Sequence, residues 1–343
     1  MTYINKILYS ITTIILLNIS IYANTEGTKL NIKLPTVPTP VKAIVLNNEY
    51  SINSRTIKFS KRIPPNYVPH RLDNIKKEIA SKDAQVGEVD NGRISAYLRG
   101  SFMEVSEVEK KLKKSGFTIL ASTPVNKKKT LISVVFTNLD MISMASTKDK
   151  GFIATLRVLI DTKKKSISIT NPLYMCKGFL QDKFDATIAN KILINIVNSF
   201  HGLKNSKDSL KFQLLPTYKF MNGMPYYKDM LEVASGDDLL ERIKENKKIV
   251  FTQELKNGSV LVGVRLSRRT RKFTKKIGRN NAAMLPYPVL IEDGKARILD
   301  PKYYISFMYP LLEMTQFMTI ATIPDAIYKD IQRALRKKRQ KKH

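Results

Sequence analysis

The sequence predicts an α+β protein made of two tandem β-α-β-β-β-β-α domains with antiparallel sheets, preceded by a signal peptide and an extended Pro-containing arm. Three observations support this prediction. The N-terminus carries a short apolar run, the next residues are punctuated by Pro, and the rest of the chain repeats one order of strand and helix patterns at a near-constant offset. The expected boundaries are 1–23 for the signal peptide, 24–89 for the arm, 90–202 for the first repeat, 203–224 for a linker, 225–336 for the second repeat and 337–343 for a basic tail.

The composition indicates a globular chain with a strong positive charge. Of its 343 residues, 43% are hydrophobic, which is enough to bury a core without crosslinks. The chain holds 59 Lys and Arg against 29 Asp and Glu, a formal net charge of +30. Three His and the single Cys176 are too few for a zinc finger or an intramolecular disulfide, so we expect no metal site and no cofactor. Cys176 lies in an apolar stretch, and we expect a small buried hydrophobe there rather than a reactive thiol.

The first 23 residues have the pattern of a secretory signal. Lys6 supplies a positive charge before the apolar residues 7–21, and Ile21-Tyr22-Ala23 fits a small-residue cleavage site. Polar residues dilute this run, which is shorter than the roughly 20 apolar residues of a membrane span. The pattern therefore favours cleavage over an uncleaved anchor, and a periplasmic or secreted location for the mature protein. Pro-rich sequence in residues 24–89 indicates an extended arm.

The first repeat is predicted as a strand, a helix, four strands and a second helix. Ser101-x-x-Glu104 has the spacing of a capping box before the first helix, and Gly116 follows that helix. Asn171-Pro172 is expected to close the sheet, and Asp182 to cap the second helix. The strands are expected over 93–99, 117–121, Leu131–Thr137, 153–160 and Ser166–Thr170.

The second repeat follows the same order. Asn171-Pro172 and Asp300-Pro301 lie 129 positions apart, and so do Thr130-Leu131-Ile132 and Ser259-Val260-Leu261. An offset shared by a strand and a distant turn indicates a duplication, with an insertion in the second copy near 311–321. Short turns join the successive strands, so the sheets must be antiparallel. The expected strands are 227–233, 249–255, 259–266, 283–291 and 296–299, with a capped helix after Ser235-x-x-Asp238 and a last helix over 323–336.

One stretch of the second repeat resembles a known family. Met284-Leu285-Pro286-Tyr287-Pro288, the strand that follows it and Asp300-Pro301 are similar to the centre of the "domain of unknown function 302" family. The resemblance implies a TATA-box-binding-protein-like α+β fold for each repeat. Many members of that family carry a Cys after the Leu-Pro pair. This chain has Tyr287 there and Arg157 at the matching position of the first repeat, so the thiol is absent from both.

The strongest candidate binding site is a basic stretch at 266–281. It contains seven basic residues and no acidic one, whereas the matching stretch 138–150 of the first repeat has nearly balanced charge. Arg and Lys in such a cluster bind oxyanions, so we expect an anionic ligand, a polysaccharide or a membrane surface as partner. The basic tail is a second, weaker candidate. The seven residues are Arg268, Arg269, Arg271, Lys272, Lys275, Lys276 and Arg279.

Catalytic patterns are missing from the sequence. His70 lies in the arm and His201 at a helix end, no Ser-His-Asp arrangement can be proposed, and no Gly-rich phosphate loop is present. The sequence therefore favours a binding or interaction protein over an enzyme. Two alternatives stay open: an enzyme or redox accessory acting in a groove between the repeats, and a nucleic-acid-binding protein. The signal peptide argues against nucleic acid as the partner, because DNA and RNA are usually met inside the cytoplasm.

The signal-peptide hypothesis predicts a defined mature N-terminus. The charge of Lys6, the apolar run and Ala23 place cleavage before Asn24. N-terminal sequencing of the protein recovered from its host should begin near Asn24. A protein that retains Met1 and fractionates with membranes would show that the run is an anchor.

Overall fold

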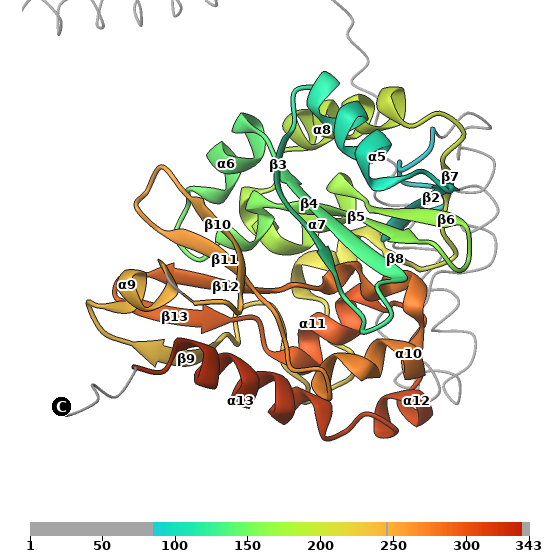
Figure 1. The fold of residues 1–343 in the computed structure, drawn as a ribbon. Coiled ribbons are helices and arrows are strands. Elements are labelled where there is room, and N and C mark those ends of the chain that lie inside the picture. The colour runs from blue at the N-terminus through green and yellow to red at the C-terminus, as the bar shows by residue number, and fades with distance from the viewer. Residues whose placement is uncertain (1–84, 245, 338–343) are drawn as a thin grey trace, which may run out of the picture. The chain divides into compact units, whose positions relative to one another are not determined.

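The computed structural model describes residues 85–337 except 245, and all of them belong to one compact unit, Asn74–His343. The predicted signal peptide, most of the arm and most of the basic tail lie outside the described residues. Within them, helices and antiparallel sheets combine in an α+β fold, as predicted (Figure 1). None of the helices in these ranges is long and apolar enough to cross a membrane.

The first half is built around a six-stranded antiparallel sheet in the order β3-β4-β5-β6-β2-β7. Its strands β4 and β5 are almost wholly buried, which agrees with their short, nearly continuous apolar sequences. The strands are β2 (Tyr97–Ser101), β3 (Thr118–Pro124), β4 (Leu131–Thr137), β5 (Leu156–Asp161), β6 (Ser166–Thr170) and β7 (Lys204–Asn205).

The second half holds a five-stranded antiparallel sheet in the order β10-β11-β12-β13-β9. Once β7 is set aside, the strand order matches that of the first sheet. The registers match as well, because Arg157 lies opposite Val135 in one sheet and Tyr287 lies opposite Val264 in the other. The two sheets therefore share strand order and register. The strands are β9 (Leu231–Ser235), β10 (Ile249–Glu254), β11 (Val260–Val264), β12 (Tyr287–Glu292) and β13 (Lys295–Ile298).

The segment predicted as a linker, 203–224, carries secondary structure. Its strand β7 extends the first sheet beside β2, and β8 (Ser209–Lys211) pairs with β1 (Arg93–Ser95). A 3₁₀ helix, η3 (Phe212–Thr217), follows. The chain between the two halves is therefore fixed to the first half through backbone hydrogen bonds.

Nine α-helices cover or separate the sheets within the described residues. Four lie in the first half and five in the second, and short 3₁₀ turns η2 (Gln181–Lys183) and η4 (Thr270–Lys272) adjoin two of them. The α-helices are α5 (Val105–Lys114), α6 (Leu139–Ala145), α7 (Pro172–Leu180), α8 (Ala186–Ser199), α9 (Leu239–Lys244), α10 (Phe273–Ile277), α11 (Pro301–Met308), α12 (Met314–Met318) and α13 (Ile323–Leu335).

Two helices, α7 and α11, lie where the sequence predicted only the end of a sheet. Each begins with Pro in its first turn, after Asn171 or Asp300, whose side chain accepts a hydrogen bond from a backbone N–H of that turn. Both helices are apolar on nearly every side, because they are buried all round. Such a helix lacks the 3.6-residue alternation from which helices are recognised, so the prediction missed them.

Several predicted boundaries are also wrong. Glu104 is itself the N-cap residue of α5 and makes no side-chain capping bond, so there is no capping box with Ser101. Helix α8 is capped by Asp185, which accepts from the N–H groups of Thr187 and Ile188, and not by Asp182. The predicted strand 227–233 starts later, as β9.

The predicted strands 153–160 and 283–291 each begin with a 3₁₀ helix instead. These are η1 (Gly151–Ala154) and η5 (Arg279–Met284), and each packs on the sheet of the other half. The turn η1 contacts β11 and β12, and η5 contacts β5 and β6. The apolar residues of η1 and η5 pack against the other half rather than within their own sheet. They are buried as strand residues would be, so their local sequence pattern resembled that of a strand.

The two halves share a core in which α7 packs against α11 (Figure 1). The ring of Phe307 lies 4.7 Å from that of Tyr174 and 5.2 Å from that of Phe179, measured between centroids. Gly178 permits this approach, because a Cβ there would lie 2.3 Å from the Phe307 ring. Buried Tyr hydroxyls add polar contacts across the boundary: Tyr174 donates to the carbonyl of Phe307 at 2.7 Å.

We predict that Gly178→Ala destabilises the protein although Ala is the better helix former. The higher helix propensity of Ala would by itself raise the free energy of unfolding by about 1 kcal/mol. The added methyl group meets a buried aromatic ring that cannot turn away, and overpacking of this kind costs about 1–3 kcal/mol. Urea unfolding measures the net change. In a Phe307→Leu background the same substitution should cost less, and an equal cost in both backgrounds would contradict the proposed contact.

Candidate functional site

The basic stretch 266–281 forms a series of short helices anchored at both ends. At its start, the carboxylate of Asp330 on α13 accepts a hydrogen bond from the N–H of Ser267 at 2.8 Å. Phe273 and Thr274 are buried, which fixes α10 against the body. Gly278 ends α10 with φ of 128°, a conformation that side-chain-bearing residues rarely adopt. The basic side chains therefore project from an ordered framework.

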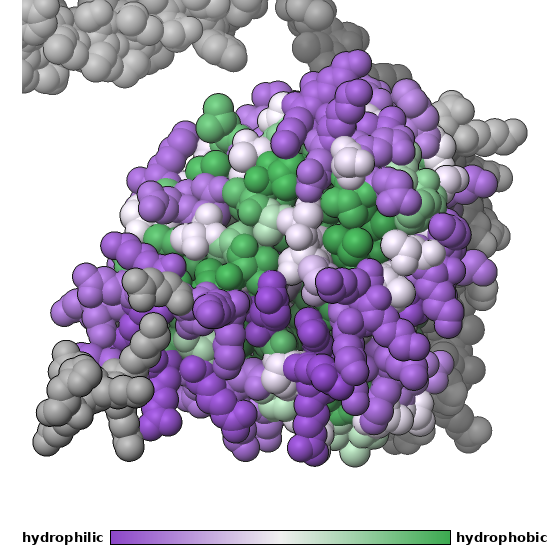
Figure 2. Space-filling model, viewed as in Figure 1, coloured by the Kyte–Doolittle hydropathy of each residue, from purple (hydrophilic) through white to green (hydrophobic). Residues whose placement is uncertain are grey.

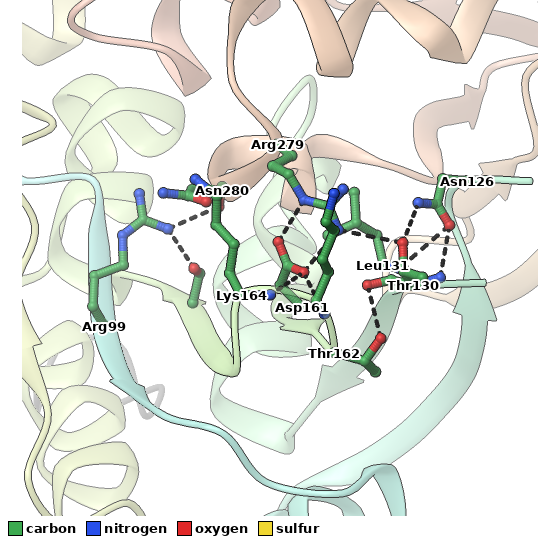
Figure 3. Close-up of polar contacts among 11 residues, drawn as sticks. Arg99, Asn126, Thr130, Leu131, Asp161, Thr162, Lys164, Arg279 and Asn280 are labelled. Atoms are coloured by element: carbon green, nitrogen blue, oxygen red, sulfur yellow. Dashed lines mark hydrogen bonds and ion pairs between the residues drawn. The ribbon is translucent and has the colours of Figure 1, made fainter. Parts of the chain in front are cut away.

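Arg279 lies inside the contact between the halves (Figure 3). Its guanidinium donates to both carboxylate oxygens of Asp161 at the end of β5, with Nε to Oδ2 at 2.6 Å and Nη2 to Oδ1 at 2.7 Å. It also reaches Thr130 Oγ1 at 3.3 Å. The side chain of Asp161 is only 4% exposed, so this is a forked, largely buried ion pair. Arg279 therefore differs from the other six predicted residues, because its charge is paired with an acidic group within the protein.

A second polar contact between the halves surrounds Arg99 of β2 (Figure 3). Its guanidinium donates to the carbonyl of Asn280 at 2.7 Å and forms an ion pair with Asp208 at 2.9 Å. Asn281 donates to the other carboxylate oxygen of Asp208 at 2.8 Å. No local sequence pattern predicted this cluster, because its members are far apart in the chain.

Arg271 is half-buried beside the first half. Its Nη1 donates to the carbonyl of Pro124 at 3.5 Å, and the neighbouring Arg265 reaches Thr123 Oγ1 at 3.3 Å. Burial lowers the pKa of Arg271, and the positive charges of Arg265 and Arg268 lower it further. The like charges therefore lie close enough to repel one another. The positive potential that they create together attracts anions.

The other five predicted residues are exposed and form what we call the basic ridge: Arg268, Arg269, Lys272, Lys275 and Lys276. None of them forms an ion pair with an acidic group among the described residues. They project from nine residues of largely helical chain, so they spread over roughly 15 Å. That is within two Debye lengths at physiological ionic strength, so their fields add.

A second basic surface lies at the end of α13. A shallow pocket of about 400 Å³ between β9 and α13 is lined by five basic residues and by no acidic one. Arg242 of α9 stands at its edge and donates to the carbonyl of Leu335. The basic run predicted at the C-terminus includes three of these residues, Arg333, Arg336 and Lys337, whereas Arg242 of α9 and Lys329 of α13 were not predicted. The five residues are Arg242, Lys329, Arg333, Arg336 and Lys337.

The candidate reactive groups of the sequence, Cys176 and the residues at the two family Cys positions, are buried. Cys176 is 1% exposed, as expected, and burial raises the pKa of its thiol, which keeps it protonated. Tyr287 and Arg157, at the two positions where the resembled family has Cys, are also buried. Tyr287 donates to the carbonyl of Leu299 at 2.9 Å, and Arg157 donates to the carbonyl of Pro286 at 3.4 Å.

Residues 85–337, apart from 245, contain no cluster of His, Cys, Asp or Glu that could hold a metal ion. His201 is exposed at the end of α8, and His70 lies outside the described residues.

Comparison with known proteins gives no match. No family model, no curated protein and no solved structure matches the chain. The similarity to the "domain of unknown function 302" family therefore stays a prediction from the residues alone.

We predict that Asp161→Asn lowers the free energy of unfolding by about 1–3 kcal/mol at pH 7, because charged hydrogen bonds to Arg279 are lost. Burial by itself raises the pKa of Asp161, but the hydrogen bonds from Arg279 and from the N–H groups of Lys164 and Lys163 outweigh it and hold the pKa below 3.8. A carboxyl with a lowered pKa stabilises the folded state above its unfolded pKa and loses that effect as the pH falls.

The difference between the wild type and Asp161→Asn should therefore shrink below about pH 4. Denaturant unfolding at pH 7 and pH 3 measures it. Asp140→Asn is the control, because Asp140 pairs with Lys191 at an exposed site and its removal should cost at most about 1 kcal/mol. A difference for Asp161→Asn that does not vary with pH would contradict the ionic account.

Proposed function

We propose that the protein is an exported binding protein that holds an anionic partner on the basic ridge. The observation that carries the proposal is the exposure of five basic side chains, on an anchored framework, without an acidic partner among the described residues. Export rests on the signal-like residues 1–23. The interaction is non-enzymatic: the ridge concentrates and holds an anion, and Arg supplies forked donors to phosphate, sulfate or carboxylate groups.

The first half supports this proposal by contrast. The matching stretch 138–150 carries three of its four charges in ion pairs, and the fourth, Lys150, is buried and donates to Gln181. Asp140 binds Lys191 at 2.9 Å, Asp149 binds Arg297 at 2.5 Å and Lys148 binds Asp293 at 3.0 Å. The same connection between strands is therefore built there with balanced charge. The fold therefore does not require unpaired positive charge at this position. Repulsion between such charges lowers the stability of the folded state.

The alternative of an enzyme acting between the repeats gains no support. A pocket lined by both halves, beside Pro124 and Pro286, has a volume of about 10 Å³. That space holds roughly one water molecule, which is too little for a substrate. A nucleic acid would suit the charge of the ridge, and the export signal continues to argue against it.

We predict that replacing Arg268, Arg269, Lys272 and Lys275 by Ser weakens binding to heparin resin by at least about tenfold. Each charge removed lowers a field that acts on the whole ligand. Wild-type binding should fall as salt is raised, because the Debye length shortens from about 8 Å at 0.15 M to about 3 Å at 1 M. Elution salt and the dissociation constant for soluble heparin measure the effect.

The control removes the same charge elsewhere. Lys110, Lys113, Lys114 and Lys128 are exposed in the first half, where Glu107 and Glu109 lie among them, and their replacement by Ser should change binding far less. Deletion of 337–343 tests the basic tail as the alternative surface. If the tail deletion abolishes binding and the ridge variant binds as the wild type does, the proposal names the wrong surface.

A further inference from the structure

Large apolar side chains are exposed around α12. Leu311 is 55% exposed, Met314 37% and Met318 62%. The ring of Phe317 packs at 5.2 Å from that of Phe220, which brings Met221, itself 47% exposed, to the same place. We call Leu311, Met314, Met318 and Met221 the α12 patch. Exposed apolar groups gathered in this way mark a surface that meets something other than water.

The α12 patch belongs to an insertion that the fold does not need. In the first half α7 is joined to α8 by residues 181–185, whereas in the second half α11 is joined to α13 by residues 309–322, which include α12. The sequence already indicated extra residues here. The two halves share their strand order without this segment, so its exposed Met and Leu side chains are not explained by packing.

The α12 patch adjoins the basic ridge. Lys276 of the ridge donates from Nζ to the carbonyl of Thr319, directly after α12, at 3.2 Å. The hydropathy of the surface agrees: hydrophilic residues gather over α13 and α10, and paler green atoms lie at the lower edge of the same face near α12 (Figure 2). Thus the unpaired cations of the basic ridge and the exposed apolar groups of the α12 patch lie side by side.

We infer that the basic ridge and the α12 patch together dock on an anionic lipid bilayer. The inference rests on the proposed function and names the partner. Lys and Arg of the ridge contact lipid phosphates, and the flexible Met and Leu side chains enter the interface between headgroups and acyl chains. A water-dissolved polyanion gives the apolar groups nothing to contact.

A protein partner fits less well. Protein interfaces are depleted in Lys and anchored by aromatic residues, and here the aromatic Phe317 is buried while Lys276 of the ridge contacts the end of α12. The one acidic residue in the segment, Glu313, is held in a capping box at the start of α12. Its charge is thereby committed to the first turn of that helix.

The test is co-sedimentation of the full chain with vesicles of phosphatidylglycerol and phosphatidylcholine, compared with vesicles of phosphatidylcholine alone. We expect the wild type to bind the anionic vesicles at least about tenfold more tightly. Met314→Ser combined with Met318→Ser should weaken vesicle binding about tenfold and leave heparin binding within twofold. Any contribution of residues 1–23 is the same in every variant, so the comparison reports on the α12 patch.

Leu139→Ser is the matched control. Leu139 is 78% exposed on α6 of the first half, beside Asp140 and away from the ridge, and its replacement should leave vesicle binding unchanged. Circular dichroism and the unfolding midpoint should be the same for all variants, because the replaced side chains are exposed.

The outcomes separate this inference from the proposed function. Binding to heparin without binding to anionic vesicles overturns the lipid inference and leaves the basic ridge as an anion site. Vesicle binding that the Met substitutions do not weaken also overturns it. A chain that binds neither heparin nor vesicles overturns both.

Discussion

The packing of α7 against α11 is the contact on which the rest of the structure depends. Almost every residue of both helices is buried, and the absent side chain of Gly178 sets how closely they approach. The turns η1 and η5 each pack on the sheet of the opposite half. The connection from β11 to β12 first runs along the surface, where it carries the basic ridge. It then reaches the boundary between the halves at η5.

Arg279 shows how one run of basic residues divides into two roles. At the boundary its charge is offset by Asp161 and removed from solvent, which holds the end of the run in place. A few residues earlier the same residue type is exposed and lacks a partner among the described residues. The ion pair anchors the end of the segment that carries the ridge. An anchored cluster loses less conformational entropy on binding than an unanchored one does, so the ion pair favours the proposed binding.

Local sequence patterns predicted those features that depend on near neighbours. The α+β class followed from strand periodicity and short turns, and the basic stretch followed from composition. Helices α7 and α11 were missed because burial on every side removes the periodic signal. The pairing of Arg279 with Asp161 could not be foreseen, since 118 positions separate the two residues and every Arg in the run had the same local context. The α12 patch was foreseen as an insertion, but its exposure depends on tertiary packing.

Comparison of the two halves explains where function would be found. Both sheets have the same strand order. In each half a buried helix directly follows a strand, since α7 follows β6 and α11 follows β13. They differ in the connections at their edges: the connection 138–150 pairs three of its four charges and α7 is joined briefly to α8, whereas the second half leaves the cations of the ridge exposed and adds α12. A core constrained by mutual packing tolerates little change, while a connection at the edge can gain charge or apolar surface without disturbing it. The connections at the edges carry the ridge and the patch, so the two halves differ most in the segments on which the proposed binding rests.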